Sequence, residues 1–189
     1  MSFEELVVKA RSFRRFNEAL RVSQQALLDL VNVARRTPSA GNRQPLRYML
    51  LHQAADCARL FPHLSWAAAL KGWGGPAEGE RPSAYILLLA DSEINKDAEC
   101  DAGIAAQTIQ LAATERGMGM CMLGAINRPR IQEEFKIPER YRLVLVLALG
   151  VPAEKVVLDE AAEGHVSYYR DEQGVHHVPK RLLKDVILA

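Results

Sequence analysis

The chain has few cysteines, almost no net charge and no long hydrophobic run. Its three cysteines are odd in number and widely spaced, so they suggest neither a disulfide framework nor a zinc ribbon. With 24 basic and 23 acidic residues, the formal net charge of +1 creates no field that favours nucleic acid or a membrane surface. The apolar run from Leu143 to Leu149 is too short to span a bilayer, and the N-terminus has no charged-then-apolar signal pattern. We therefore expect a reduced, cytoplasmic protein that binds neither nucleic acid nor membrane.

Motifs typical of several other activities are absent as well. No Gly-x-Gly-x-x-Gly stands between a strand and a helix, which argues against a Rossmann dinucleotide site. No nucleophile elbow supports hydrolase chemistry. His176 and His177 are adjacent in an extended segment and face opposite ways, and no third ligand is evident, so we predict no metal site. Without repeats or a linker, 189 residues at 49% hydrophobic content predict one domain spanning 1–189.

The hydrophobic pattern predicts helices and strands that do not alternate strictly. Helices are expected over 3–10, from the N-cap Ser23 to Arg36, and over 54–61, 97–116 and 129–135; strands are expected over 47–52, 85–90, 119–123 and 142–150. This order favours an α+β fold over a doubly wound sheet. The glycine-rich segment 71–82 is either a lid or a plain connection, and the tail after residue 152 shows no large core element.

Two polar segments carry the functional signal. Arg11, Ser12 and Arg14 supply two cationic donors and a hydroxyl, which suit a phosphate group. The turn-forming segment 38–45 adds the side-chain amides of Asn42 and Gln44, which can donate and accept hydrogen bonds. Together they predict a nucleotide-like cofactor with a phosphate at one end and a polar ring edge at the other.

Four ordered segments together resemble the FMN-dependent nitroreductase family. They are Arg-Ser-x-Arg at 11–14, Pro-Ser-x-x-Asn-x-Gln-Pro at 38–45, the glycine-rich stretch 117–125 and the closing Val-Pro-Lys-Arg at 178–181. The chain departs from the pattern at Ala10, where many members have a basic residue, and at Leu46, where many have an aromatic one. The resemblance implies a nitroreductase-like α+β fold with an antiparallel-rich sheet flanked by helices. It also implies an intertwined homodimer in which the C-terminal tail adds a strand to the partner's sheet.

The resemblance also implies where FMN would bind. It assigns the phosphate to Arg11, Ser12, Arg14, Lys180 and Arg181, and leaves open which of the last two makes contact. It places Pro38, Ser39, Ala40, Asn42 and Gln44 against the flavin held mainly by the other subunit. It gives the backbone contact at flavin N5 to Leu123, Gly124 and Ala125. The alternatives are an Asn that only caps a turn, and glycines that only end strands.

The function implied is that of an FMN-dependent NAD(P)H oxidoreductase. Hydride would pass through flavin N5 in a ping-pong scheme to nitroaromatic, quinone or similar small-molecule acceptors, with no catalytic side chain and with NADH or NADPH as donor. Two alternatives are a specialised flavin enzyme of the same fold (a dehalogenase, a flavin-fragmenting enzyme or a heterocycle dehydrogenase) and a non-catalytic flavin-binding module. Cys121 is either redox-active or a small buried hydrophobe. Trp66 and Trp73 either line the substrate face or anchor the 71–82 loop.

Overall fold

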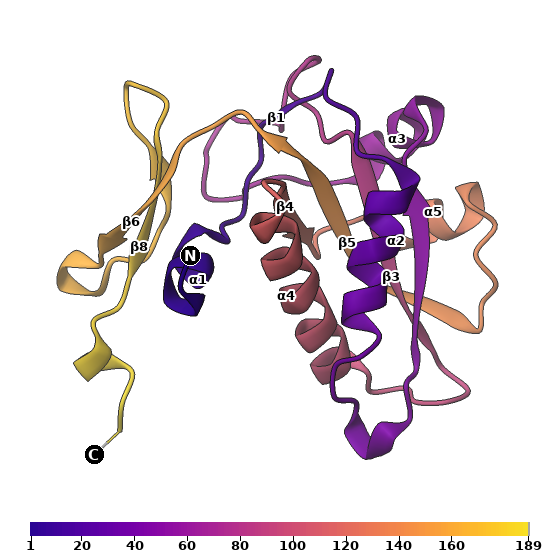
Figure 1. The fold of residues 1–189 in the computed structure, drawn as a ribbon. Helices are drawn as coiled ribbons and strands as arrows, with labels where there is room; N and C mark the ends of the chain where they lie inside the picture. The colour runs from indigo at the N-terminus through magenta and orange to yellow at the C-terminus, as the bar shows by residue number, and fades with distance from the viewer. Residues whose placement is uncertain (189) are drawn as a thin grey trace.

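The computed structural model of the protein describes residues 1–188 (Figure 1). Its helices are α1 (Phe3–Lys9), α2 (Gln24–Ala34), α3 (Ala54–Leu60), α4 (Glu99–Glu115) and α5 (Arg128–Glu134), with short 3-10 turns η1 (Ala40–Asn42), η2 (Phe61–His63), η3 (Ala162–Gly164) and η4 (Leu183–Asp185). Its strands are β1 (Phe16–Asn17), β2 (Leu46–Leu51), β3 (Ala84–Asp91), β4 (Gly119–Leu123), β5 (Tyr141–Pro152), β6 (Val156–Glu160), β7 (Tyr169–Arg170) and β8 (His176–Lys180).

The central sheet is antiparallel and is built around β5. Its strand order is β1-β5-β3-β2, and β4 also pairs with β5. Every residue of β3 is buried, which its continuous apolar sequence predicts, because helices cover both faces of the sheet. One core layer packs α2 and α4 on the sheet, and the other packs α3 and α5 on the opposite face. The α+β expectation is therefore confirmed.

The local signals at the helix ends agree with the sequence. The Ser23 side chain accepts a hydrogen bond from the Ala26 N–H, and Val22 and Leu27 are buried beside that cap. Helix α4 is slightly shorter than the predicted 97–116, and it is followed by Gly117 in the left-handed conformation at φ 75°. Across residues 1–188, no helix combines the length and the apolar character needed to cross a membrane.

A second, smaller sheet forms in the tail, where the sequence showed no large element. Strand β6 pairs in parallel with β8, and β7 pairs antiparallel with β8, in the order β6-β8-β7. Figure 1 shows this sheet standing beside α1, at the end of the molecule away from α3 and α5. It therefore brings the C-terminal part of the chain close to the N-terminal helix.

Candidate functional site

The two ends of the chain meet at a cavity of about 340 Å³, which we call the cation cavity. It contains four of the predicted phosphate residues: Arg11, Ser12, Arg14 and Lys180. The remaining lining residues are Ala10, Gln107, Gln110, Tyr168, His176 and Val178. Three cations and no carboxylate line this space, so its chemistry favours an anion.

The segment 11–15, which we call the clamp segment, is held against β4 and the end of β5. Ser12 forms a bridge with Met120, and the Phe13 N–H donates to the Met120 carbonyl at 3.1 Å. Two glycines make close packing possible here, Gly119 beneath the clamp segment and Gly150 beneath Phe16 of β1, which follows it. A Cβ on Gly119 would lie 2.9 Å from the Phe13 ring, and a Cβ on Gly150 would lie 2.8 Å from the Phe16 ring. Gly119 is therefore more than a strand-end residue.

Arg11 lies in the cavity with part of its hydrogen-bonding capacity unused. Its guanidinium donates to the Val7 carbonyl, whereas its Nε is buried and has no hydrogen-bond partner among the described residues. Burial lowers the pKa of Arg11, because removal from water disfavours the cation. The Gln110 side chain fixes the Arg11 backbone by donating to its carbonyl at 3.0 Å. A bound dianion would compensate the desolvated charge, so the residues present fit a phosphate group.

Arg14 is held by groups from the tail. Its guanidinium lies 4.7 Å from the centre of the Tyr168 ring, and its Nη1 lies 3.0 Å from Nε2 of His176. Burial, and then the charge of Arg14, lower the pKa of His176 to about 4. At neutral pH the imidazole is therefore uncharged and can accept a hydrogen bond from Arg14.

The structure separates the two closing basic residues. Lys180 lines the cation cavity, whereas Arg181 does not belong to its lining. The Arg181 guanidinium lies near Gly164 instead, 3.9 Å from where a Cβ on that glycine would be. Neighbouring residues in an extended chain face opposite ways, so only one of the pair reaches the cavity.

The segment 38–45, which we call the amide loop, lies at the other end of α4 (Figure 1). Three residues here adopt left-handed backbone conformations: Gly41 (φ 57°), Asn42 (φ 52°) and Gln44 (φ 50°). The Gln44 side chain donates to Oδ1 of Asn42 at 3.1 Å, and both residues are exposed. Non-glycine residues in this region are strained by about 1 kcal/mol or more each, and such strain clusters at functional sites.

Asp101, in the first turn of α4, secures the amide loop. Its buried carboxylate accepts hydrogen bonds from the Ser39 hydroxyl and from the Ala40 N–H at 3.1 Å. The Ser39 oxygen in turn accepts from the Gln44 N–H at 2.9 Å. A second cavity of about 220 Å³ is lined in part by Pro38, Ser39, Gln44 and Asp101. Ser39 is therefore part of the inner wall of the loop.

Within one chain, the amide loop and the cation cavity do not meet. Asp101 lies under the loop, and the nearest α4 residue that lines the cavity is Gln107, six residues further along the helix, a rise of roughly 9 Å at about 1.5 Å per residue. The predicted phosphate residues and the amide-loop residues therefore form two separate groups along α4.

Leu123, Gly124 and Ala125 lie at the end of β4, along the strand from the clamp segment. Gly124 and Ala125 are exposed. The Ala125 carbonyl accepts from the Ser65 N–H at 2.9 Å, which ties the segment to the chain after η2. A Cβ on Gly124 would meet only Leu145, at an ordinary 3.7 Å, so packing within the chain does not require glycine there.

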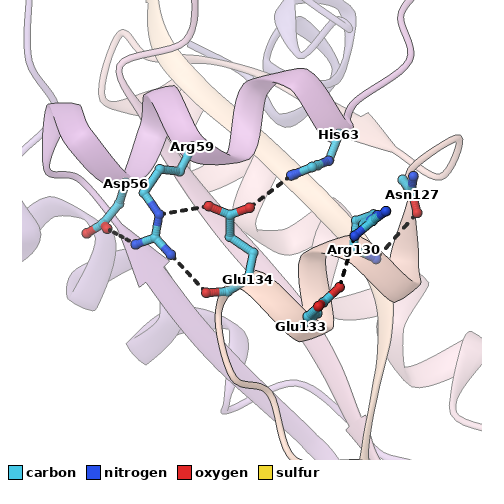
Figure 2. A network of polar contacts seen from close by, with 7 residues as sticks. All are labelled: Asp56, Arg59, His63, Asn127, Arg130, Glu133 and Glu134. Carbon is cyan, nitrogen blue, oxygen red and sulfur yellow. Dashed lines mark hydrogen bonds and ion pairs between the residues drawn. The ribbon is translucent and has the colours of Figure 1, made fainter.

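A polar network joins α3 and η2 to α5, close in the chain to the turn that follows this segment (Figure 2). Glu134 of α5 accepts from Arg59 Nε at 2.9 Å and lies 3.3 Å from His63 Nε2. The Arg59 hydrogen bond, followed by that of His63, lowers the pKa of the Glu134 carboxyl. The His63 carbonyl also accepts from the Asn127 N–H at 2.9 Å, so α3, η2 and α5 hold the 124–127 turn together.

The 71–82 loop is anchored by the residues around it. Gly75 packs on the buried Trp66 indole so closely that a Cβ would lie 2.6 Å from that ring. The Arg170 guanidinium lies 4.5 Å from the centre of the Trp73 ring. These contacts favour the anchoring interpretation of both tryptophans. Burial raises the pKa of the Cys121 thiol to about 11, which fits a small buried hydrophobe.

Sequence reasoning missed several residues that the tail and α4 bring to the cation cavity. The spacing of Gln107 and Gln110, two amides three residues apart on a helix otherwise rich in alanine, was a usable signal. No local pattern marks Tyr168 or His176 as a cavity residue, and both reach the cavity only because β7 and β8 fold back toward the N-terminus.

Comparisons with known proteins point in one direction. A family model described as "Nitroreductase family" matches residues 7–151. The chain is 22% identical over 184 residues to the Bacillus subtilis protein named "Putative NAD(P)H nitroreductase YodC", covering 76% of this chain and 87% of that protein. A crystal structure of a nitroreductase family protein from Clostridium difficile is 25% identical, with a TM-score of 0.67 over 82% of this chain and 86% of that one. A protein from Exiguobacterium sibiricum, solved in complex with FMN, is 20% identical, with a TM-score of 0.68 over 82% and 90%.

Proposed function

The chain belongs to the nitroreductase family, and from that premise we propose that it is an FMN-dependent NAD(P)H oxidoreductase. The observation that carries the proposal is the cation cavity, in which Arg11, Arg14 and Lys180 converge with no carboxylate in the lining. The name of the relative YodC includes NAD(P)H, and the Exiguobacterium structure contains FMN, which supports the choice of donor and cofactor. The nitroreductase-like fold is the one the family predicts.

In this proposal, the chain's own residues bind and orient the cofactor. Arg11, Arg14 and Lys180 neutralise the phosphate, and the Ser12 hydroxyl adds a donor beside them. The exposed backbone at Gly124 and Ala125, held by the hydrogen bond from Ser65 to the Ala125 carbonyl, receives the ring. Bound there, FMN would supply the redox chemistry, which is hydride transfer from NAD(P)H to a nitroaromatic, quinone or similar acceptor. No side chain is needed as a catalytic acid or base.

We further propose that the site is completed by a second copy of the chain. Because the amide loop and the cation cavity lie roughly 9 Å apart along α4 within one chain, a loop from the partner protomer is better placed to reach the flavin. Each protomer, a single domain of 1–189, would also exchange its C-terminal tail. The tail supports this with large apolar side chains that are strongly exposed in the single chain: Leu183, Val186, Ile187 and Leu188.

Steady-state kinetics test the proposed reaction. NADH or NADPH would be varied at several fixed concentrations of a nitroaromatic or a quinone. Because both substrates would use the same flavin face in turn, we expect parallel lines in double-reciprocal plots. Intersecting lines would contradict alternate binding. Saturation with FMN without reduction by either nucleotide would support a non-catalytic flavin-binding module instead.

A further inference from the structure

Glu154 is a buried carboxylate directly behind the cation cavity. It follows the last residues of β5, and only 2% of its side chain is exposed. Its Oε1 accepts hydrogen bonds from the backbone N–H groups of Arg14 and, at 3.0 Å, of Arg15. Its Oε2 accepts from the Arg170 guanidinium at 2.8 Å. Glu154 is not among the residues that line the cavity.

The two hydrogen bonds to Oε1 fix the backbone of the clamp segment at Arg14, whose side chain lines the cation cavity. Two successive N–H groups that converge on one oxygen restrict the backbone on both sides of Arg14. The Ala153 N–H also donates to the Arg15 carbonyl at 2.9 Å. The residues just after β5 therefore bind both N–H groups and a carbonyl group of the clamp segment. The direction in which the Arg14 side chain leaves the backbone therefore depends on Glu154.

The contact to Oε2 joins two further parts of the chain to the same carboxylate. Arg170 lies over the Trp73 ring of the 71–82 loop, and Tyr168, two residues before it, packs against Arg14. Arg14 and Arg170 are two cations in a poorly solvated region, and an unpaired carboxylate or cation there would be costly. Glu154 offsets their repulsion while leaving the cavity lining itself free of negative charge.

We propose that Glu154 is a positioning residue for the cofactor phosphate, and that it gives the site its preference for a 5′-phosphorylated flavin over the same flavin without phosphate. It touches no ligand and acts through Arg14. The inference rests on the proposed function, because it takes FMN as the cofactor. It extends that function by assigning the phosphate preference to a buried acid outside the cavity.

The test compares FMN with riboflavin, which differ only in the phosphate. Apoprotein of the wild type, of Glu154→Gln and of the control Glu172→Gln is titrated with each flavin by fluorescence. Glutamine keeps the size of the side chain but removes the charge that Arg170 and the two N–H groups share. We expect Glu154→Gln to reduce the ratio of FMN to riboflavin affinity at least tenfold while riboflavin affinity stays within a factor of about three, because charge-assisted hydrogen bonds of this kind are individually strong.

The control carries the same substitution in the same part of the chain. Glu172 is exposed in the β7–β8 turn, and its side chain makes no hydrogen bond or ion pair to the described residues. We expect Glu172→Gln to behave as the wild type. If Glu154→Gln fails to fold, Glu154→Asp keeps the charge but is one methylene too short to hold all three donors, and we expect the same ratio to fall severalfold.

The outcomes separate this inference from the proposed function. A wild type that prefers FMN, with an unchanged ratio in the Glu154 variants, overturns the positioning role and leaves the function standing. An equal loss of FMN and riboflavin affinity also overturns it, since that is the effect of general destabilisation. A wild type that binds neither flavin refutes the proposed function, and the inference with it.

Discussion

At the scale of single residues, Arg14 is the cation of the cavity whose guanidinium makes the most kinds of contact with neighbouring residues. Its guanidinium donates to the Ser12 carbonyl at 3.2 Å and contacts Tyr168 and His176 from the tail. Such pre-ordering lowers the conformational entropy lost when a ligand binds. The positive charge of Arg14 is therefore held in one position before a ligand binds.

Replacing Arg14 by alanine tests this arrangement. We expect Arg14→Ala to weaken FMN binding at least tenfold, because a fixed charge-assisted contact to the phosphate is lost. The flavin content of the purified protein, from the ratio of visible to ultraviolet absorbance, measures the effect. Arg36→Ala, at an exposed position outside the cavity, is the control. Flavin content that is unchanged in both variants would remove Arg14 from the phosphate site.

Gly150 matters because Phe16 of β1, the residue that follows the clamp segment, packs directly on it. A Cβ there would lie 2.8 Å from the buried Phe16 ring, closer than real Cβ contacts allow. We expect Gly150→Ala to lower the free energy of unfolding by about 1–3 kcal/mol, the usual effect of overpacking. Urea denaturation measures this. Gly74→Ala, where no atom lies within 4 Å and φ is not left-handed, is expected to be nearly neutral, and equal effects would contradict the packing argument.

Among single residues, the sequence could predict only those site residues that lie close together in the chain. Arg11, Ser12 and Arg14 stand together in the chain, so their convergence was foreseeable. Glu154 and His176 lie 140 and 162 residues away from Arg14, and only tertiary folding brings them to it. No local signal separates a buried, partnered glutamate from an exposed one.

At the scale of elements, the amide loop depends on the first turn of α4. The left-handed residues of the loop are stabilised by Asp101, whose carboxylate accepts hydrogen bonds from Ser39 and Ala40. These bonds, together with the hydrogen bond from the Gln44 N–H to the Ser39 oxygen, offset the strain of Asn42 and Gln44.

Asp101→Asn is the corresponding test. The amide keeps the size of the carboxylate but replaces charge-assisted hydrogen bonds with neutral ones. We expect the free energy of unfolding to fall by about 1.5–3 kcal/mol, the usual range for hydrogen bonds to a charged group. Asp97→Asn, at an exposed position just before α4, is the control. A loss no larger than that of the control, measured by thermal unfolding, would show that Asp101 does not hold the loop.

The tail sheet contains a pH-sensitive pair of contacts. His177 lies 2.8 Å from an Asp159 oxygen and 3.1 Å from an Asp171 oxygen, and its ring stacks on Tyr169. The Asp171 and Asp159 carboxylates raise the pKa of His177. The resulting stability is therefore complete below about pH 6.5, the ordinary histidine value, and is lost as pH rises through the raised pKa.

We expect the difference in melting temperature between the wild type and His177→Gln to shrink as the pH is raised from 6 to 9. The physical reason is that only the protonated imidazole attracts both carboxylates. At the acid end, His177 lowers the pKa of Asp171, so the Asp171 contribution disappears as pH falls through that lowered value. A difference that stayed constant across the alkaline range would contradict this account.

The sequence predicted the elements of the central sheet better than those of the tail. Strands β3 and β5 have long apolar runs, and α4 has a clear C-cap, so local pattern was sufficient. Strand β8 reads His-His-Val-Pro-Lys and pairs in parallel with β6 across an intervening 3-10 turn and β7. Such non-local pairing of short, polar strands leaves little trace in periodicity.

At the scale of the whole molecule, the separation of the amide loop from the cation cavity has a clear consequence. If the partner's loop completes each site, FMN binding and dimer formation must strengthen each other. We expect sedimentation equilibrium to show a dimer, with dissociation favoured when flavin is removed. A purely monomeric protein that still bound FMN tightly would rule out the shared site.

The central claim is that this chain is a flavoenzyme that NAD(P)H can reduce. The most direct measurement is the visible absorption spectrum of the FMN-loaded protein before and after addition of NADH or NADPH without oxygen. The account predicts flavin bands that bleach on addition and return when a nitroaromatic or quinone acceptor is supplied. A protein that takes up no FMN from excess cofactor, or whose bound flavin stays oxidised with both nucleotides, would contradict the account.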